Sequence, residues 1–104
     1  MSIARLAATI AARRSADADS SWTARLLARG PEKCAEKFGE EAIEAVIEAV
    51  RGDAARLTSE AADVVYHLLV MCAARGVTLA DIEAELARRA DSSGLDEKSA
   101  RTKP

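Results

Sequence analysis

The sequence has few aromatic residues, few glycines and few prolines. Its 104 residues include one Trp, one Tyr, one Phe, 5 glycines and 2 prolines, against 24 alanines. Aromatic and β-branched residues favour strands, whereas alanine is the strongest helix former. The composition therefore excludes a β-sandwich or barrel and predicts an all-α protein.

The sequence also has only two cysteines and a small net charge, and each of these excludes some classes of function. Cys34 and Cys72 form no CxxC or Cys/His cluster, which argues against a zinc site or a redox motif. We expect both to be reduced in a cytoplasmic protein. The net charge of −2 provides no field toward nucleic acid or an anionic membrane. The longest uncharged stretch, 64–74, is too short to span a bilayer. From the charge and from this length, we expect neither nucleic acid nor a membrane as a partner.

Glycine, proline and capping residues divide the chain into helical segments. The pair Gly30-Pro31 breaks the chain, Gly52 and Gly76 can end helices, and Asp53 can cap the next one. Apolar residues recur at helical spacing between these positions. The predicted helices span 2–14, 22–29, 31–51, 54–75 and 79–90.

The chain is long enough for one small domain only. We expect residues 1–90 to form it, and 91–104, where Leu95 is the only large aliphatic residue, to be a disordered tail. Within the domain, 64–74 is apolar round the whole helix, and two or three neighbouring helices cannot cover it. The predicted fold is therefore a bundle of about five helices completed by homodimerisation or a larger homo-oligomer.

Four acidic residues are symmetric about the turn at Gly52. Glu41 and Glu44 are three residues apart, and Glu60 and Asp63 have the same spacing on the next predicted helix. Residues three apart share a helix face. In an antiparallel hairpin, Glu44 lies level with Glu60, and Glu41 lies level with Asp63.

The same hairpin places the four acids beside an apolar stripe. Ile43, Val46, Ile47 and Val50 are predicted to form the buried stripe of the first helix, so the acids lie at the margin of the core. Like charges at a partly buried seam repel one another. A hard cation with oxygen ligands, Mg²⁺ or Mn²⁺, would remove this repulsion.

Other interpretations of these polar residues stay open. The acids could pair with Lys33, Lys37 and Arg51 on a solvated face. The only histidine, His67, follows Asp63 by four residues and lacks the preceding Glu of the Glu-x-x-His motif in di-iron bundles. It could contact a substrate, or it could lie hydrogen-bonded in the core.

Three segments of the chain resemble one enzyme family. SSWTARLLARGPEK at 20–33, EKFGEEAIEAVIEA at 36–49 and EAADVVYHLLVMCAARG at 60–76 resemble the phosphoribosyl-ATP pyrophosphatases of histidine biosynthesis. The ExxE/ExxD spacing alone is typical of the wider superfamily of all-α, MazG-like nucleoside triphosphate pyrophosphohydrolases. The KFGEE and YHLLV segments point to the narrower family, and the similarity extends over about residues 6–89.

The resemblance implies a reaction and a set of site residues. It implies Mg²⁺-dependent hydrolysis of phosphoribosyl-ATP, between the α- and β-phosphates, to phosphoribosyl-AMP and pyrophosphate. Glu40 would be a further ligand or would orient the attacking water, and Lys37 would contact a phosphate. The implied metal ligands are Glu41, Glu44, Glu60 and Asp63. Further candidates for substrate contacts are Ser21, Tyr66, His67 and Trp22, the last standing where the family has tyrosine.

Two alternative functions remain open. The substrate could be another nucleoside or deoxynucleoside triphosphate, as in other pyrophosphohydrolases of the superfamily. The chain could instead be a helical interaction module whose acidic residues are inert.

Overall fold

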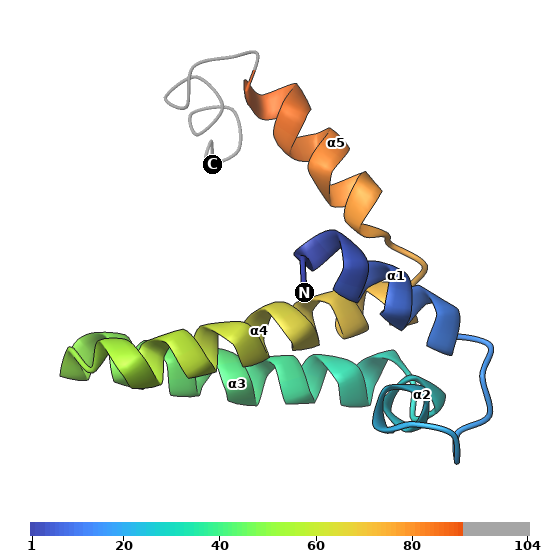
Figure 1. Ribbon diagram of the computed structural model, residues 1–104, viewed down its shortest axis with the longest axis horizontal. Coiled ribbons are helices and arrows are strands. Elements are labelled where there is room, and N and C mark those ends of the chain that lie inside the picture. Colours follow the sequence, from blue (N-terminus) through green and yellow to red (C-terminus); the bar gives the residue numbers. More distant parts are fainter. Residues whose placement is uncertain (91–104) are drawn as a thin grey trace, which may run out of the picture.

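The computed structural model describes residues 1–90, and these form five α-helices and no strand (Figure 1). The predicted all-α fold is confirmed, and each predicted helix boundary lies within one residue of the observed one. The predicted disordered tail lies outside the described residues. The helices are α1 (Ile3–Arg13), α2 (Trp22–Ala28), α3 (Pro31–Arg51), α4 (Ala54–Ala74) and α5 (Leu79–Ala90).

Side-chain caps fix where α2 and α5 begin. Ser21 Oγ accepts a hydrogen bond from the backbone N–H of Ala24 at 3.0 Å. Before α5, the Asp81 N–H donates to Thr78 Oγ1 at 3.1 Å, and the Thr78 N–H donates to Asp81 Oδ2 at 2.9 Å. These bonds satisfy backbone N–H groups that the first helical turn leaves without partners.

Helices α3 and α4 form an antiparallel hairpin joined by Gly52 and Asp53. Gly52 has a φ of +80°, in the left-handed region that favours glycine, and its N–H donates to the Glu48 carbonyl at 3.1 Å. Asp53 Oδ1 then accepts the N–H of Arg56 at 3.0 Å, and α4 begins. Figure 1 shows the hairpin extending well beyond α1 and α2, with its turn at the far end.

Two glycine substitutions test the turn against the helix interior. Gly52→Ala is expected to destabilise the protein by about 1–2 kcal/mol, because a Cβ disfavours the left-handed backbone. Gly39→Ala is the control: it lies inside α3, where an added Cβ meets no atom within 4 Å. Alanine there is expected to stabilise the protein by roughly 0.5–1 kcal/mol. Urea unfolding in EDTA measures both, and effects of the same sign would contradict this account of the turn.

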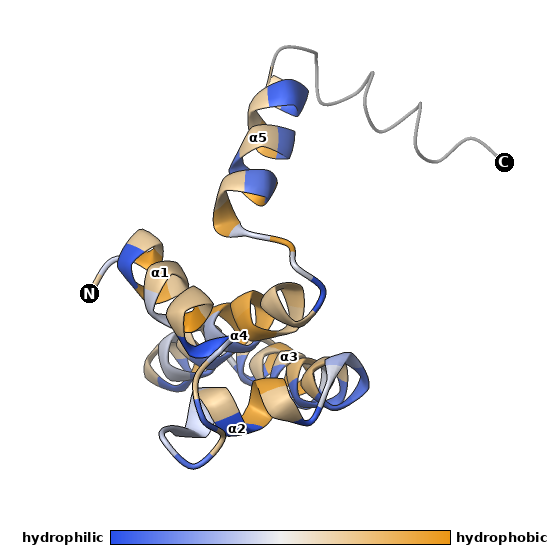
Figure 2. Ribbon diagram, turned by 90° about the vertical axis from the view of Figure 1, so that its right-hand side faces the viewer, coloured by the Kyte–Doolittle hydropathy of each residue, from blue (hydrophilic) through white to orange (hydrophobic). Residues whose placement is uncertain are grey.

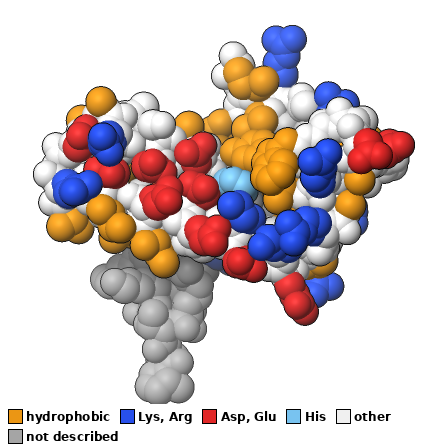
Figure 3. Space-filling model, turned by 90° about the horizontal axis from the view of Figure 1, so that it is seen from below, with side chains coloured by type: hydrophobic (Ala, Val, Ile, Leu, Met, Phe, Trp, Pro, Cys, Tyr) orange, Lys and Arg blue, Asp and Glu red, His pale blue; other side chains and the backbone are white. Residues whose placement is uncertain are grey.

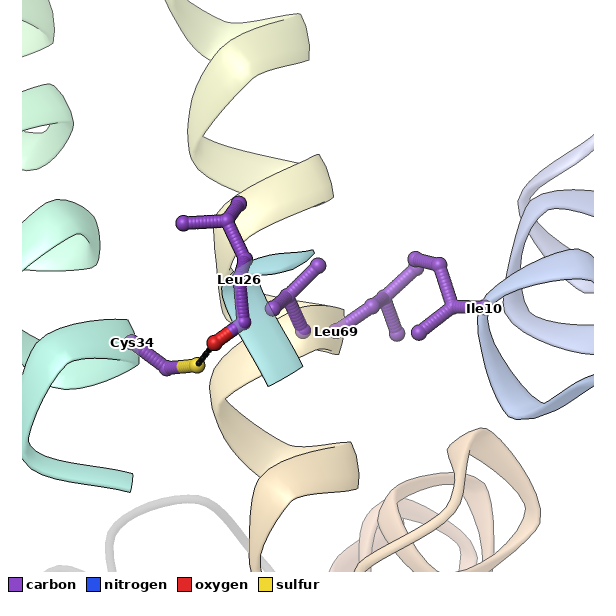
Figure 4. Packing of buried hydrophobic residues seen from close by; sticks show 5 residues of the cluster. Ile10, Leu26, Cys34 and Leu69 are labelled. Carbon is purple, nitrogen blue, oxygen red and sulfur yellow. Dashed lines mark hydrogen bonds between the residues drawn. The ribbon is translucent and has the colours of Figure 1, made fainter. Parts of the chain in front are cut away.

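The core lies where α1, α2, α3 and the C-terminal half of α4 meet. Ile10, Leu26, Leu69 and Val70 are buried there together with Cys34. Figure 4 shows Ile10 and Leu69 approaching each other from α1 and α4. Cys34 Sγ donates to the Leu26 carbonyl at 3.3 Å, and burial raises the pKa of this thiol. Both cysteines are free, as the sequence predicts.

One expectation about burial is wrong within a single chain, and another stays a prediction. The stretch 64–74 was expected to need a second subunit, and its own chain buries His67, Leu69 and Val70 but leaves the other eight residues only partly buried. The α3 stripe was expected to be buried, but Ile43, Val46, Ile47 and Val50 are 63, 60, 46 and 83% exposed. The reason is the length of the hairpin, because α1 and α2 pack near its open end and do not reach this stripe (Figure 1).

Figure 2 shows α5 projecting away from the other four helices. The same view shows apolar residues along α4, which is 21 residues long and reaches a mean hydropathy of 1.3. Although 64–74 is short, the whole helix has the length and composition to cross a membrane. However, a core helix of a soluble protein meets the same criterion, and α4 packs along α3 with Glu60 and Asp63 at the contact.

Candidate active site

The α3–α4 hairpin brings the four acidic residues together. Carboxylate oxygens of Glu41, Glu60 and Asp63 all lie within 4.8 Å of one another. Glu44 lies beside them, close enough to act on both Glu41 and Glu60. We call these four residues the acid cluster. Figure 3 shows acidic side chains gathered over the hairpin, next to the pale-blue histidine. The structure confirms the predicted pairs across the turn, because Glu41 lies near Asp63 and Glu44 lies near Glu60.

The surroundings of the acid cluster disfavour full ionisation. Burial raises the pKa of Glu41, the charges of Glu44 and Asp63 raise it further, and Lys37 opposes them. Burial also raises the pKa of Glu60, and the neighbouring carboxyl group of Glu44 raises it further. Glu60 Oε2 is buried with no hydrogen-bond partner among the described residues.

These observations fit a divalent cation in the acid cluster. The cluster offers several carboxylate oxygens from two facing helices, and such oxygens are the ligands that Mg²⁺ and Mn²⁺ prefer. A cation placed among them would replace repulsion with attraction and would give the buried Glu60 oxygen a partner.

A lysine and the single histidine border the acid cluster. Lys37 Nζ lies 3.3 Å from Glu40 Oε1, so Glu40 points to this lysine and stands apart from the three clustered oxygens. His67 is only 7% exposed, and its Nδ1 has no hydrogen-bond partner among the described residues. Burial and the charge of Lys37 lower the pKa of His67, while the charges of Asp63 and Glu40 act in the opposite direction, so the surroundings on balance favour the neutral imidazole. The alternative of a hydrogen-bonded core histidine does not hold for Nδ1.

Helix α2 adds aromatic and hydroxyl groups near the histidine. Thr23 Oγ1 and Tyr66 OH lie 2.5 Å apart and link α2 to α4. The rings of Tyr66 and His67 meet edge to face, with centroids 4.9 Å apart. Trp22 is 55% exposed at the start of α2, and Ser21 caps that helix. Thr23 was not among the predicted site residues, although it lies in the segment 20–33 that resembles the family.

Comparison with known proteins decides the family. The family model for phosphoribosyl-ATP pyrophosphohydrolase matches residues 3–90. The chain belongs to the phosphoribosyl-ATP pyrophosphohydrolase family. This match covers all five helices and therefore the whole acid cluster. The resemblance inferred from three segments of the sequence is confirmed.

Relatives in this pyrophosphohydrolase family are similar over nearly their whole length. A phosphoribosyl-ATP pyrophosphatase of Cereibacter sphaeroides is 75% identical over 93% of this chain and 94% of its own. A protein of the same name from Dinoroseobacter shibae is 73% identical over 95% of this chain and 97% of its own. The one from Paracoccus denitrificans is 70% identical, over 93% and 90% of the two chains.

Proposed function

We propose that this protein hydrolyses phosphoribosyl-ATP to phosphoribosyl-AMP and pyrophosphate, as a cytoplasmic step of histidine biosynthesis. The observation that carries the proposal is the acid cluster on the α3–α4 hairpin, with three carboxylate oxygens within 4.8 Å and a lysine beside them. The family match and the names of the most similar relatives support this substrate.

The proposed cofactor is Mg²⁺, with Mn²⁺ as a substitute. When bound, the cation would neutralise the triphosphate and polarise the scissile phosphorus. Glu60 is central to the proposed ligand set, because its Oε2 is buried without a hydrogen-bond partner among the described residues. The residues that would hold the cation are Glu41, Glu44, Glu60 and Asp63.

The remaining residues of the site would bind the substrate and orient water. Glu40 is half exposed next to the acid cluster, where its carboxylate could orient the water that attacks the α-phosphorus. Lys37 would contact a phosphate oxygen and offset charge that develops on the leaving pyrophosphate. The exposed ring of Trp22 suits stacking on the purine, since large aromatic faces bind flat rings. Side chains proposed for further substrate contacts are Ser21, Tyr66 and His67.

We also propose a homodimer in which the exposed α3 stripe of one chain packs against a second copy. The stripe consists of Ile43, Val46, Ile47 and Val50, and four large aliphatic side chains on one helix face are costly to leave in water. A second copy fits because the stripe spacing of 3, 1 and 3 residues is that of helix–helix packing. Two such hairpins related by a twofold axis would complete a four-helix core.

Assaying the products over a panel of substrates tests the proposed function. We expect ³¹P NMR to show pyrophosphate and phosphoribosyl-AMP from phosphoribosyl-ATP in Mg²⁺, and no turnover in EDTA. Activity on dNTPs with none on phosphoribosyl-ATP would instead indicate a pyrophosphohydrolase with another substrate. No hydrolysis of any nucleotide by the folded protein would support the interaction module.

A further inference from the structure

Basic and acidic residues follow one another along a single face of α3. Lys33, Lys37 and Glu41 are spaced four residues apart, and Glu44 continues the same face. The face is therefore basic toward the start of α3 and acidic toward the turn. Figure 3 shows a group of acidic side chains on one side of the histidine and several Lys and Arg side chains on its other side, with further acidic side chains among them.

The two lysines are held against the protein. The side chains of Lys33 and Lys37 are 30 and 29% exposed, whereas their ion-pair partners Glu36 and Glu40 are 57 and 53% exposed. Each pair measures 3.3 Å. Exposed pairs of this kind contribute little, so an anionic ligand can replace the glutamates as partner of the lysines. Lys33 is thus available at the basic end of this face, and the proposed function gives it no role.

The proposed substrate has two separate anionic ends. Its triphosphate would be attracted to the cation expected in the acid cluster. The 5-phosphate of its second ribose has no such cation beside it, so carboxylates would repel it. Lys33 lies eight residues before Glu41, about 12 Å along the helix at 1.5 Å per residue. Two riboses and a purine separate the two phosphate groups, which is enough to reach from the acid cluster to Lys33.

We propose that Lys33 binds the 5-phosphate of the second ribose and thereby selects phosphoribosyl nucleotides over ATP and AMP. This inference rests on the proposed function and adds a residue that determines specificity. An ammonium group suits a phosphate because it is a compact charge with three donors.

Binding of two nucleotides that differ only in the second phosphoribosyl group tests the proposal. Phosphoribosyl-AMP and AMP are titrated in Mg²⁺, with binding followed by calorimetry and by the fluorescence of the single Trp22. Wild type is expected to bind phosphoribosyl-AMP more tightly. Lys33→Gln should weaken phosphoribosyl-AMP about tenfold or more, the usual effect of losing a charged hydrogen bond, and should leave AMP within twofold.

Two further variants separate this contact from general effects of charge or folding. Lys33→Arg keeps the positive charge and should retain most of the preference, while Arg5→Gln removes a charge from the exposed part of α1 and should retain all of it. Equal weakening of both nucleotides in Lys33→Gln would place Lys33 elsewhere in the site, and no change would exclude it. Either result overturns the inference while leaving the proposed function intact, because wild-type turnover of phosphoribosyl-ATP is measured separately.

Discussion

Replacing Glu60 with Gln is expected to lower kcat for pyrophosphate release by at least about 100-fold, since changes even to residues that support metal ligands cost 10- to 100-fold. Gln keeps the shape of the side chain and removes the charge of the one carboxylate oxygen in the acid cluster that is buried without a partner. Glu83→Gln on α5, an exposed position, is the matched control and should leave kcat unchanged.

The same substitution is expected to stabilise the metal-free protein at pH 7. Burial and Glu44 raise the folded-state pKa of Glu60, so the penalty for its ionisation is absent below the unfolded carboxyl pKa near 4. The penalty grows as pH rises through the raised folded value. Glu60→Gln should therefore have more effect on urea unfolding in EDTA at pH 7 than at pH 4.

Magnesium should reverse this order of stability. Ligand binding to the native state stabilises wild type by mass action, and Glu60→Gln should lose most of that gain. Asp63→Asn should lose it as well. If Glu60→Gln destabilises the metal-free protein and keeps the response to Mg²⁺, Glu60 is a structural residue and its place among the ligands is wrong.

Introducing a charge into the α3 stripe is expected to dissociate the proposed dimer. Ile47→Glu replaces a side chain whose burial contributes about 1.5–3 kcal/mol, and a twofold interface contains the change twice. The dimer dissociation constant should rise at least about 100-fold. Sedimentation equilibrium at micromolar concentration measures this change.

Ala12→Glu is the control for the dimer test, because it adds the same charge to the exposed part of α1 and should leave the dimer intact. The activity of Ile47→Glu is expected to fall as its dimer dissociates, because a second copy then no longer packs against the hairpin that carries the acid cluster. A wild-type protein that is a folded, active monomer at these concentrations would contradict the proposed assembly.

Local signals in the sequence were sufficient to predict the helices and the register of the hairpin. Gly52 and Asp53 end one helix and cap the next within two residues, which makes α3 and α4 antiparallel and fixes which residues lie level with one another. Glu41 therefore lies level with Asp63, and Glu44 with Glu60. Whether their carboxylates converge depends also on the rotation of each helix, which the spacing alone does not fix.

Burial could not be predicted in the same way, because it depends on where short helices pack along a long hairpin. Both 64–74 and the α3 stripe are apolar, and nothing local shows which of them α1 and α2 cover. The contact of Thr23 with Tyr66 likewise joins residues 43 apart. The buried Nδ1 of His67 depends on the same packing.

Binding of Mn²⁺ to the protein tests the central claim most directly, because it needs no substrate. Free Mn²⁺ is followed by electron paramagnetic resonance as it is titrated into metal-free wild type, Glu60→Gln, Asp63→Asn and the Glu83→Gln control. Wild type and the control should bind Mn²⁺ with equal affinity, and both acid-cluster variants should bind at least about tenfold more weakly. Wild type that leaves the free Mn²⁺ signal unchanged, or variants that bind as tightly as wild type, would contradict a cation site in the acid cluster.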